Sequence, residues 1–164
     1  MAVSSILFVL GTRPEAVKCA PVILACLHDP DLEVRVLTTS QHRELQDEVL
    51  SFFGITVDHD LNLMRKEPDL IHLLGETWNG VSRRLRSHPS RLVLVQGDTS
   101  SAFAAALAAA YHAIPVAHIE AGLRTHDKSM PFPEEINRRL ISQLADLHFA
   151  PTPHAKENLL REGI

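Results

Sequence analysis

The chain has 164 residues, of which 45% are hydrophobic and 22% are charged, with seven glycines and ten prolines. This length and composition indicate one compact globular domain and exclude a fibrous, low-complexity or disordered chain. The formal net charge is −4 and no long basic run occurs, which argues against nucleic acid as a partner.

Short runs rich in Val, Ile and Leu, each bounded by turn residues, predict four buried parallel strands. They lie at residues 5–10, 33–39, 91–96 and 115–120. Helical stretches follow them, at residues 14–28, 42–53, 69–88 and 100–112. The last of these helices contains the alanine-rich sequence AFAAALAAAY, which suits close packing on a sheet.

The alternation continues to the end of the chain, with helices predicted at residues 134–145 and 153–162 and a short strand at 147–149. A further strand at residues 57–61 is only weakly patterned. Such alternation predicts a doubly wound, Rossmann-like α/β domain, with a parallel sheet covered by helices on both faces. In the strand order 3-2-1-4-5, the loops after the first, fourth and fifth strands meet at one crevice, where ligands bind.

The loop after the first strand, GTRPEAVK, places two cationic side chains at the start of a helix. Thr12 is a candidate helix cap, and Pro14 suits the first turn because its missing amide hydrogen would have no partner there. The amino end of a helix favours an anion, and Arg13 and Lys18 add positive charge, so a phosphate or sugar phosphate fits this loop. The alternative is an ordinary capped helix with solvated cations. The loop is not GxGxxG, which counts against a nicotinamide or flavin cofactor.

Acidic residues follow the fourth and fifth predicted strands. Asp98, in QGDTSS, is either a site carboxylate or the cap of the helix that begins near Ser100. Glu120 follows the apolar PVAHI and precedes two small residues, so we expect it to point from a strand end into the crevice. A partly buried carboxylate there needs a partner or a raised pKa, which makes Glu120 a candidate acid or base.

A third acidic position lies in MPFPEEINRR, at the start of the helix predicted at 134–145. The helix dipole favours Glu134 there, and an i,i+4 pair between Glu134 and Arg138 is the competing structural interpretation. Because this segment follows a loop that contains Arg124 and Thr125, we expect it to fold back over the crevice.

Asp98, Glu120 and Glu134 would then form a carboxylate cluster. Closely spaced like charges push their pKa values apart, so different proton roles become available near neutral pH. Such an arrangement suits removal of an unactivated proton beside a carbon that loses an anionic leaving group.

The ten histidines are scattered, with no H-x-x-x-H pair and no cysteine at ligand spacing, so we predict no metal site. His42 begins a helix after the second strand, and we interpret it as a surface or substrate-loop residue. Neither a G-x-S-x-G elbow nor a Walker loop occurs.

No apolar run reaches the roughly 20 residues that a membrane helix needs, and the first ten residues lack the features of a signal peptide. Cys19 and Cys26 lie too far apart on one predicted helix for a disulfide and are interpreted as reduced core thiols. These features predict a cytoplasmic protein without a membrane partner.

Seven longer segments follow one another along the chain: GTRPEAVKCAP, TTSQHREL, FGITVDHDLNLM, VQGDTSSAFAAALAA, HIEAGLRTHD, PFPEEINRRL and ADLHFAPT. Together, and in this order, they resemble the bacterial non-hydrolysing UDP-N-acetylglucosamine 2-epimerases. The resemblance covers residues 7–162, essentially the whole chain. A series of motifs is far more specific than any one of them.

The resemblance implies the N-terminal half of a glycosyltransferase-B-like enzyme, with two Rossmann-like domains and the active site between them. It implies interconversion of UDP-GlcNAc and UDP-ManNAc through elimination and re-addition of UDP, without a cofactor, for cell-surface polysaccharide biosynthesis. By motif, the catalytic carboxylates are Asp98, Glu120 and Glu134. The implied substrate-binding residues are Arg13, Lys18, Gln41, His42, Arg124 and Arg138.

The same resemblance implies that residues 1–164 are the N-terminal domain and that a UDP-binding C-terminal domain is absent from this chain. Catalysis by this half alone is in question, because one wall of the cleft is missing. A homodimer is expected. The alternatives left open are a hydrolysing epimerase that releases ManNAc, an epimerase for a diacetamido sugar nucleotide, and a non-catalytic binding or dimerisation module.

Overall fold

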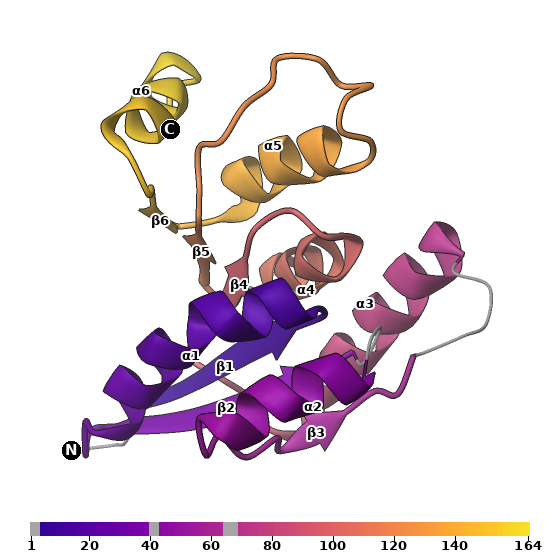
Figure 1. Cartoon of the computed structure of the whole chain (residues 1–164), viewed down its shortest axis with the longest axis vertical. Coiled ribbons are helices and arrows are strands. Elements are labelled where there is room, and N and C mark those ends of the chain that lie inside the picture. Colours follow the sequence, from indigo (N-terminus) through magenta and orange to yellow (C-terminus); the bar gives the residue numbers. More distant parts are fainter. Residues whose placement is uncertain (1–3, 40–42, 64–68) are drawn as a thin grey trace.

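The computed structural model describes residues 4–39, 43–63 and 69–164, with the backbone alone at 43 and 44. Within these residues, one parallel sheet of six strands has the order β3-β2-β1-β4-β5-β6 (Figure 1). The strands are β1 (Ser4–Leu10), β2 (Leu32–Thr38), β3 (His59–Asp60), β4 (Leu92–Gln96), β5 (Val116–Ile119) and β6 (Leu147–Phe149). The predicted doubly wound strand order is therefore confirmed.

Helices alternate with the strands as the hydrophobic pattern predicted. They are α1 (Arg13–Leu27), α2 (Arg43–Phe52), α3 (Leu70–Ser87), α4 (Ser100–Tyr111), α5 (Glu134–Leu144) and α6 (Pro153–Arg161). Asp69, Thr99 and Thr152 cap α3, α4 and α6, each accepting a backbone N–H bond with its side chain. The weakly patterned strand at 57–61 exists but is reduced to β3, which pairs with the end of β2.

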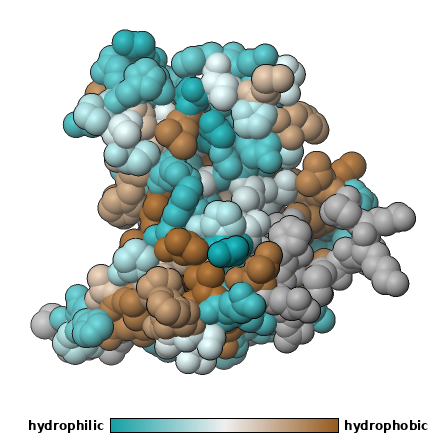
Figure 2. Space-filling view, viewed as in Figure 1, coloured by the Kyte–Doolittle hydropathy of each residue, from teal (hydrophilic) through white to brown (hydrophobic). Residues whose placement is uncertain are grey.

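The two faces of the sheet are covered by different helices. Along β1, Leu7 and Val9 pack in a core with α3, α4 and α5, whereas Phe8 and Leu10 pack in a second core with α1 and α2. Successive strand residues point to opposite faces, so a strand buried on both faces is apolar throughout. Hydrophobic side chains still gather on the exposed surface around α1, α2 and the start of α3 (Figure 2).

The strand order creates a switch point between β1 and β4. The chain leaves β1 for α1 on one face of the sheet, and leaves β4 for α4 on the other. Gly11 allows the loop after β1 to lie close against the first turn of α4, because a Cβ at this position would lie 2.7 Å from the Cβ of Ser101. The carboxyl ends of β1, β4 and β5 therefore meet around one crevice.

Both cysteines belong to α1 and both are free. Cys19 is buried, and burial raises the pKa of its thiol to about 12, which fits an inert core residue. Cys26 is only partly buried. Within the described residues, no helix combines the length and apolar character that a bilayer-spanning segment needs.

Candidate active site

A buried carboxylate organises the loop between β1 and α1. Glu15 is 1% exposed and accepts hydrogen bonds from the backbone N–H groups of Gly11, at 2.7 Å, and Thr12. It also accepts a bond of 2.7 Å from the Thr99 hydroxyl, which joins this loop to the loop after β4. Burial raises the pKa of Glu15, while its donors lower it. Because Glu15 already occupies these two amides, they are not available to an anionic ligand.

Glu120 lies directly beyond β5 and receives hydrogen bonds on both carboxylate oxygens. The ammonium of Lys18 lies 2.7 Å from Oε1 and 2.8 Å from Oε2, and the side-chain amide of Gln96 donates to Oε2. The backbone of Glu120 has a φ of 68°, a left-handed conformation that is strained for a residue other than glycine. Glu120 is thus held at the strand end beside a cation, as the sequence predicted.

Asp98 forms an ion pair with Arg138 from α5. The amide of Asn137 holds its backbone carbonyl at 2.9 Å. Burial raises the pKa of Asp98, the Arg138 charge opposes this, and Glu134 and Glu120 raise it further. Asp98 therefore interacts electrostatically with both of the other carboxylates in the predicted cluster.

Two of the alternative structural interpretations, Asp98 as a helix cap and an ion pair between Glu134 and Arg138, are wrong. Thr99, rather than Asp98, caps α4, with its hydroxyl oxygen accepting from the Ala102 amide at 3.0 Å. Arg138 pairs with Asp98, and with Glu135 at 3.5 Å, instead of pairing with Glu134. A contact across the fold displaces the local i,i+4 pair because Asp98 lies directly against the first turns of α5.

The segment between β5 and α5 runs out beyond the sheet before it returns (Figure 1). Glu135 fixes its path, since this fully buried carboxylate accepts from the Thr125 amide at 3.0 Å, the His126 amide at 3.2 Å and Arg139 at 2.9 Å. The expectation that this segment folds back to the crevice holds for the start of α5, which reaches Asp98.

The remaining predicted binding residues lie in different surroundings. The Arg124 side chain is fully buried and pairs with Glu162 through two bonds, of 2.8 Å and 2.7 Å, so it ties this segment to the end of α6. Arg13 is exposed at the start of α1 and forms no ion pair with the described part of the chain. Gln41 and His42 lie outside the described residues.

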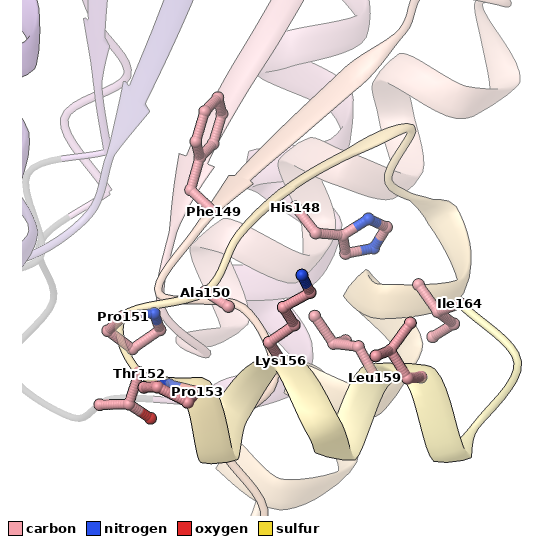
Figure 3. Close-up of a pocket in the computed structure, with 10 residues that line it drawn as sticks. His148, Phe149, Ala150, Pro151, Thr152, Pro153, Lys156, Leu159 and Ile164 are labelled. Atoms are coloured by element: carbon pink, nitrogen blue, oxygen red, sulfur yellow. The ribbon is translucent and has the colours of Figure 1, made fainter.

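Asp98, Glu120 and Lys18 line a hollow of about 390 Å³ at the carboxyl edge of the sheet, whereas Arg13, Glu134 and Arg138 are not among its lining residues. Its lining comes from all three predicted loops: Thr12, Pro14, Glu15, Lys18, Gln96, Gly97, Asp98, Thr99 and Glu120. A larger hollow of about 870 Å³ lies between β6 and α6 (Figure 3), where Lys156 and Leu159 point from α6 toward the side of His148. Among the described residues that line this larger hollow, none is a carboxylate.

Several residues that hold the site in place were not predicted from the sequence. Glu15 had a signal, because Thr12 and Glu15 form the T-x-x-E pattern of a capping box. Gln96 ends an apolar strand, and Asn137 contacts a residue 39 positions away, so neither has a local signature. Tertiary contacts of this kind become visible only once the fold is known.

The fold and the crevice define a class: a Rossmann-like α/β domain with a site of paired carboxylates and cations at its switch point, suited to proton transfer on an anionic substrate. The chain belongs to the UDP-N-acetylglucosamine 2-epimerase family, whose model matches residues 9–164. The resemblance in sequence is thereby confirmed.

The matches cover nearly all of this chain but less than half of the length of each relative. The UDP-N-acetylglucosamine 2-epimerase of Salmonella borreze is 49% identical over 161 residues, which cover 98% of this chain and 43% of that protein. A Neisseria meningitidis UDP-GlcNAc 2-epimerase solved with UDP-GlcNAc bound has a TM-score of 0.93 at 49% identity, over 98% of this chain and 44% of its own. A Methanocaldococcus jannaschii UDP-GlcNAc 2-epimerase in complex with UDP-GlcNAc and UDP has a TM-score of 0.91 at 35% identity, over 98% and 44%.

Proposed function

We propose that this chain is the N-terminal half of an enzyme that interconverts UDP-GlcNAc and UDP-ManNAc by eliminating and re-adding UDP. The observation that carries the proposal is the pairing of Asp98 with Arg138 and of Glu120 with Lys18 on neighbouring loops. The names of the relatives, and the solved relatives that contain UDP-GlcNAc, support this substrate.

Epimerisation at C2 requires one group to take a proton and another to return it on the opposite face. Asp98 suits the donating role, because burial raises its pKa and keeps the carboxyl protonated to higher pH than usual. Glu120 suits the accepting role, because Lys18 and Gln96 orient both of its oxygens. Glu134 completes the proposed catalytic set, since its charge acts on Asp98.

The departing group in this reaction is the UDP anion. Arg13 fits a phosphate contact, because it is exposed at the start of α1 and forms no ion pair with the described residues. Arg138 neutralises part of the negative charge of the cluster through its ion pair with Asp98. Substrate contacts by Gln41 and His42 belong to the same proposal, whereas the buried Arg124 side chain, paired with Glu162, is assigned a structural role instead of the predicted substrate contact.

The proposal also includes a second domain that holds UDP and closes the crevice. The chain spans about two fifths of the length of the curated relatives it matches, so their activity belongs to longer proteins. Closure would exclude water and position the sugar, which one wall alone does poorly. We further propose a cytoplasmic homodimer that supplies cell-surface polysaccharide synthesis.

The test uses the full-length protein that carries this sequence, incubated with UDP-GlcNAc in D2O. We expect UDP-ManNAc to appear with deuterium at C2, and the remaining UDP-GlcNAc to gain deuterium at the same carbon. Free ManNAc would instead identify a hydrolysing enzyme. Binding of UDP-GlcNAc without any C2 exchange would identify a binding module, and either outcome would overturn the proposal.

A further inference from the structure

An entirely buried histidine lies beneath the crevice. His118 is 0% exposed in β5, and its Nε2 lies 2.7 Å from the carbonyl oxygen of Gly97. A carbonyl can only accept, so Nε2 carries the hydrogen. Burial lowers the pKa of His118 to about 4, which leaves a neutral ring with one N–H group at neutral pH. That single donor is directed at Gly97, while Nδ1 has no hydrogen-bond partner among the described residues.

The peptide that His118 holds is the one that leads into Asp98. Gly97 has a φ of 71°, and its N–H donates to the Ile119 carbonyl at 3.0 Å. Consecutive residues of β5 therefore bind Gly97 on both sides, and the next residue of the chain is Glu120. One strand end thus carries one acidic residue of the site and anchors the backbone of the other.

We propose that His118 is a positioning residue, which fixes the Asp98 carboxyl group relative to Glu120 by donating a hydrogen bond to the carbonyl of Gly97. This inference rests on the proposed function for its catalytic consequence. The Gly97 carbonyl belongs to the same planar peptide as the Asp98 amide. A rotation of that peptide therefore moves the backbone nitrogen of Asp98 and changes the direction of its side chain. Rate falls steeply when a catalytic group is misplaced by even about 1 Å.

The neighbouring strand offers a matched control. His148 occupies the register position opposite His118 on β6, and its Nε2 lies 3.0 Å from the Ser142 carbonyl. The bond has the same chemistry, but its acceptor lies on α5 rather than in the turn that carries Asp98. His148 is only partly buried, but a general role of imidazole–carbonyl bonds in holding the sheet would still make the two histidines equivalent.

The experiment compares four variants of the full-length enzyme: His118→Gln, His118→Asn, His118→Leu and His148→Leu. The Gln amide can reach the Gly97 carbonyl, whereas the Asn amide is too short and Leu has no donor. We expect His118→Leu and His118→Asn to lower kcat by about tenfold or more with KM changed less than about twofold, as misplacement of a catalytic group requires. His118→Gln and His148→Leu should stay within about threefold of the wild-type kcat.

Equal kcat losses in His118→Gln and His118→Asn, or a loss in His148→Leu as large as that in His118→Leu, would overturn the inference. The Gln and Asn variants decide the matter even if His118→Leu folds poorly, because both are uncharged and polar. Wild-type kcat in both His118→Asn and His118→Leu would overturn it as well.

A second readout is independent of turnover. The ¹³C signal of the Asp98 carboxyl reports its titration, and we expect its midpoint to shift in His118→Asn but not in His118→Gln or His148→Leu. An unchanged midpoint in His118→Asn would overturn the positioning role even if the substrate proved different. Failure of the wild-type enzyme to exchange C2 hydrogen, with the predicted Asp98 shift present, would instead contradict only the proposed function.

Discussion

Two hollows of the described structure, the crevice at the switch point and the hollow between β6 and α6, differ in size and in chemistry, and only the smaller one is lined by acidic side chains. The crevice at the switch point measures about 390 Å³ and contains Asp98, Glu120 and Lys18. The hollow between β6 and α6 measures about 870 Å³ and is mostly apolar, with Lys156 and His148 among its polar residues (Figure 3). Volume alone therefore does not point to the candidate site, whereas the carboxylates at the edge where the strand order reverses do.

The largest expected effect concerns Glu120. In the full-length enzyme, Glu120→Gln should lower turnover at least about a hundredfold, because an amide cannot take a proton from the substrate or return it as a carboxyl group can. Lys156→Met, in the larger hollow, is the control and should leave turnover within about twofold of wild type. Steady-state assays with UDP-GlcNAc check both, and near-wild-type turnover of Glu120→Gln would end its assignment as a catalytic residue.

The next effect concerns Gly122, in the segment that follows β5. Gly122 has a φ of 88°, and an added Cβ would lie 2.1 Å from the carbonyl oxygen of Ala155 on α6. Gly122→Ala should therefore lower the free energy of unfolding of this chain by about 3 kcal/mol, through strain and displacement of α6. Gly163→Ala is the matched control, because Gly163 has a φ of 79° but nothing lies within 4 Å of its added Cβ. Its cost should be about 1 kcal/mol, and equal costs in urea unfolding would refute the contact.

A smaller effect follows from the buried ring of His118. Its folded pKa of about 4 lies below its ordinary value of 6.5, so the unfolded chain binds a proton first as the pH falls. This contribution is complete above about pH 6.5 and is lost as the pH falls toward 4, by about 2 kcal/mol between pH 7 and pH 5. Urea unfolding at both pH values measures the loss, and His118→Gln should reduce it by that amount. A pH dependence unchanged in His118→Gln would show that other groups cause it.

Local patterns were sufficient to predict the fold. The apolar run of β4 and the alanine-rich α4 each follow from side-chain periodicity, and the strand order followed from the alternation of strands and helices. The strand predicted at 57–61 was too long because only His59 and Asp60 pair with β2.

The site was predictable only in part. Asp98, Glu120 and Lys18 were expected together because the rule for parallel sheets brings these loops to one edge. The partner of Arg138 was not, since Asp98 lies 40 positions away and local spacing favoured Glu134. His118 gave no signal either, because a histidine within an apolar strand reveals neither its burial nor its acceptor.

The most direct test of the account is C2 exchange in the full-length Asp98→Asn enzyme. The variant is incubated with UDP-GlcNAc in D2O, and deuterium at C2 is measured in both UDP sugars against the wild type. Asparagine keeps the shape of Asp98 but cannot act as an acid or a base toward the substrate, so C2 exchange and epimerisation should both fall at least about a hundredfold. Wild-type exchange in this variant would contradict the claim that the carboxylates at this edge of the sheet carry the chemistry.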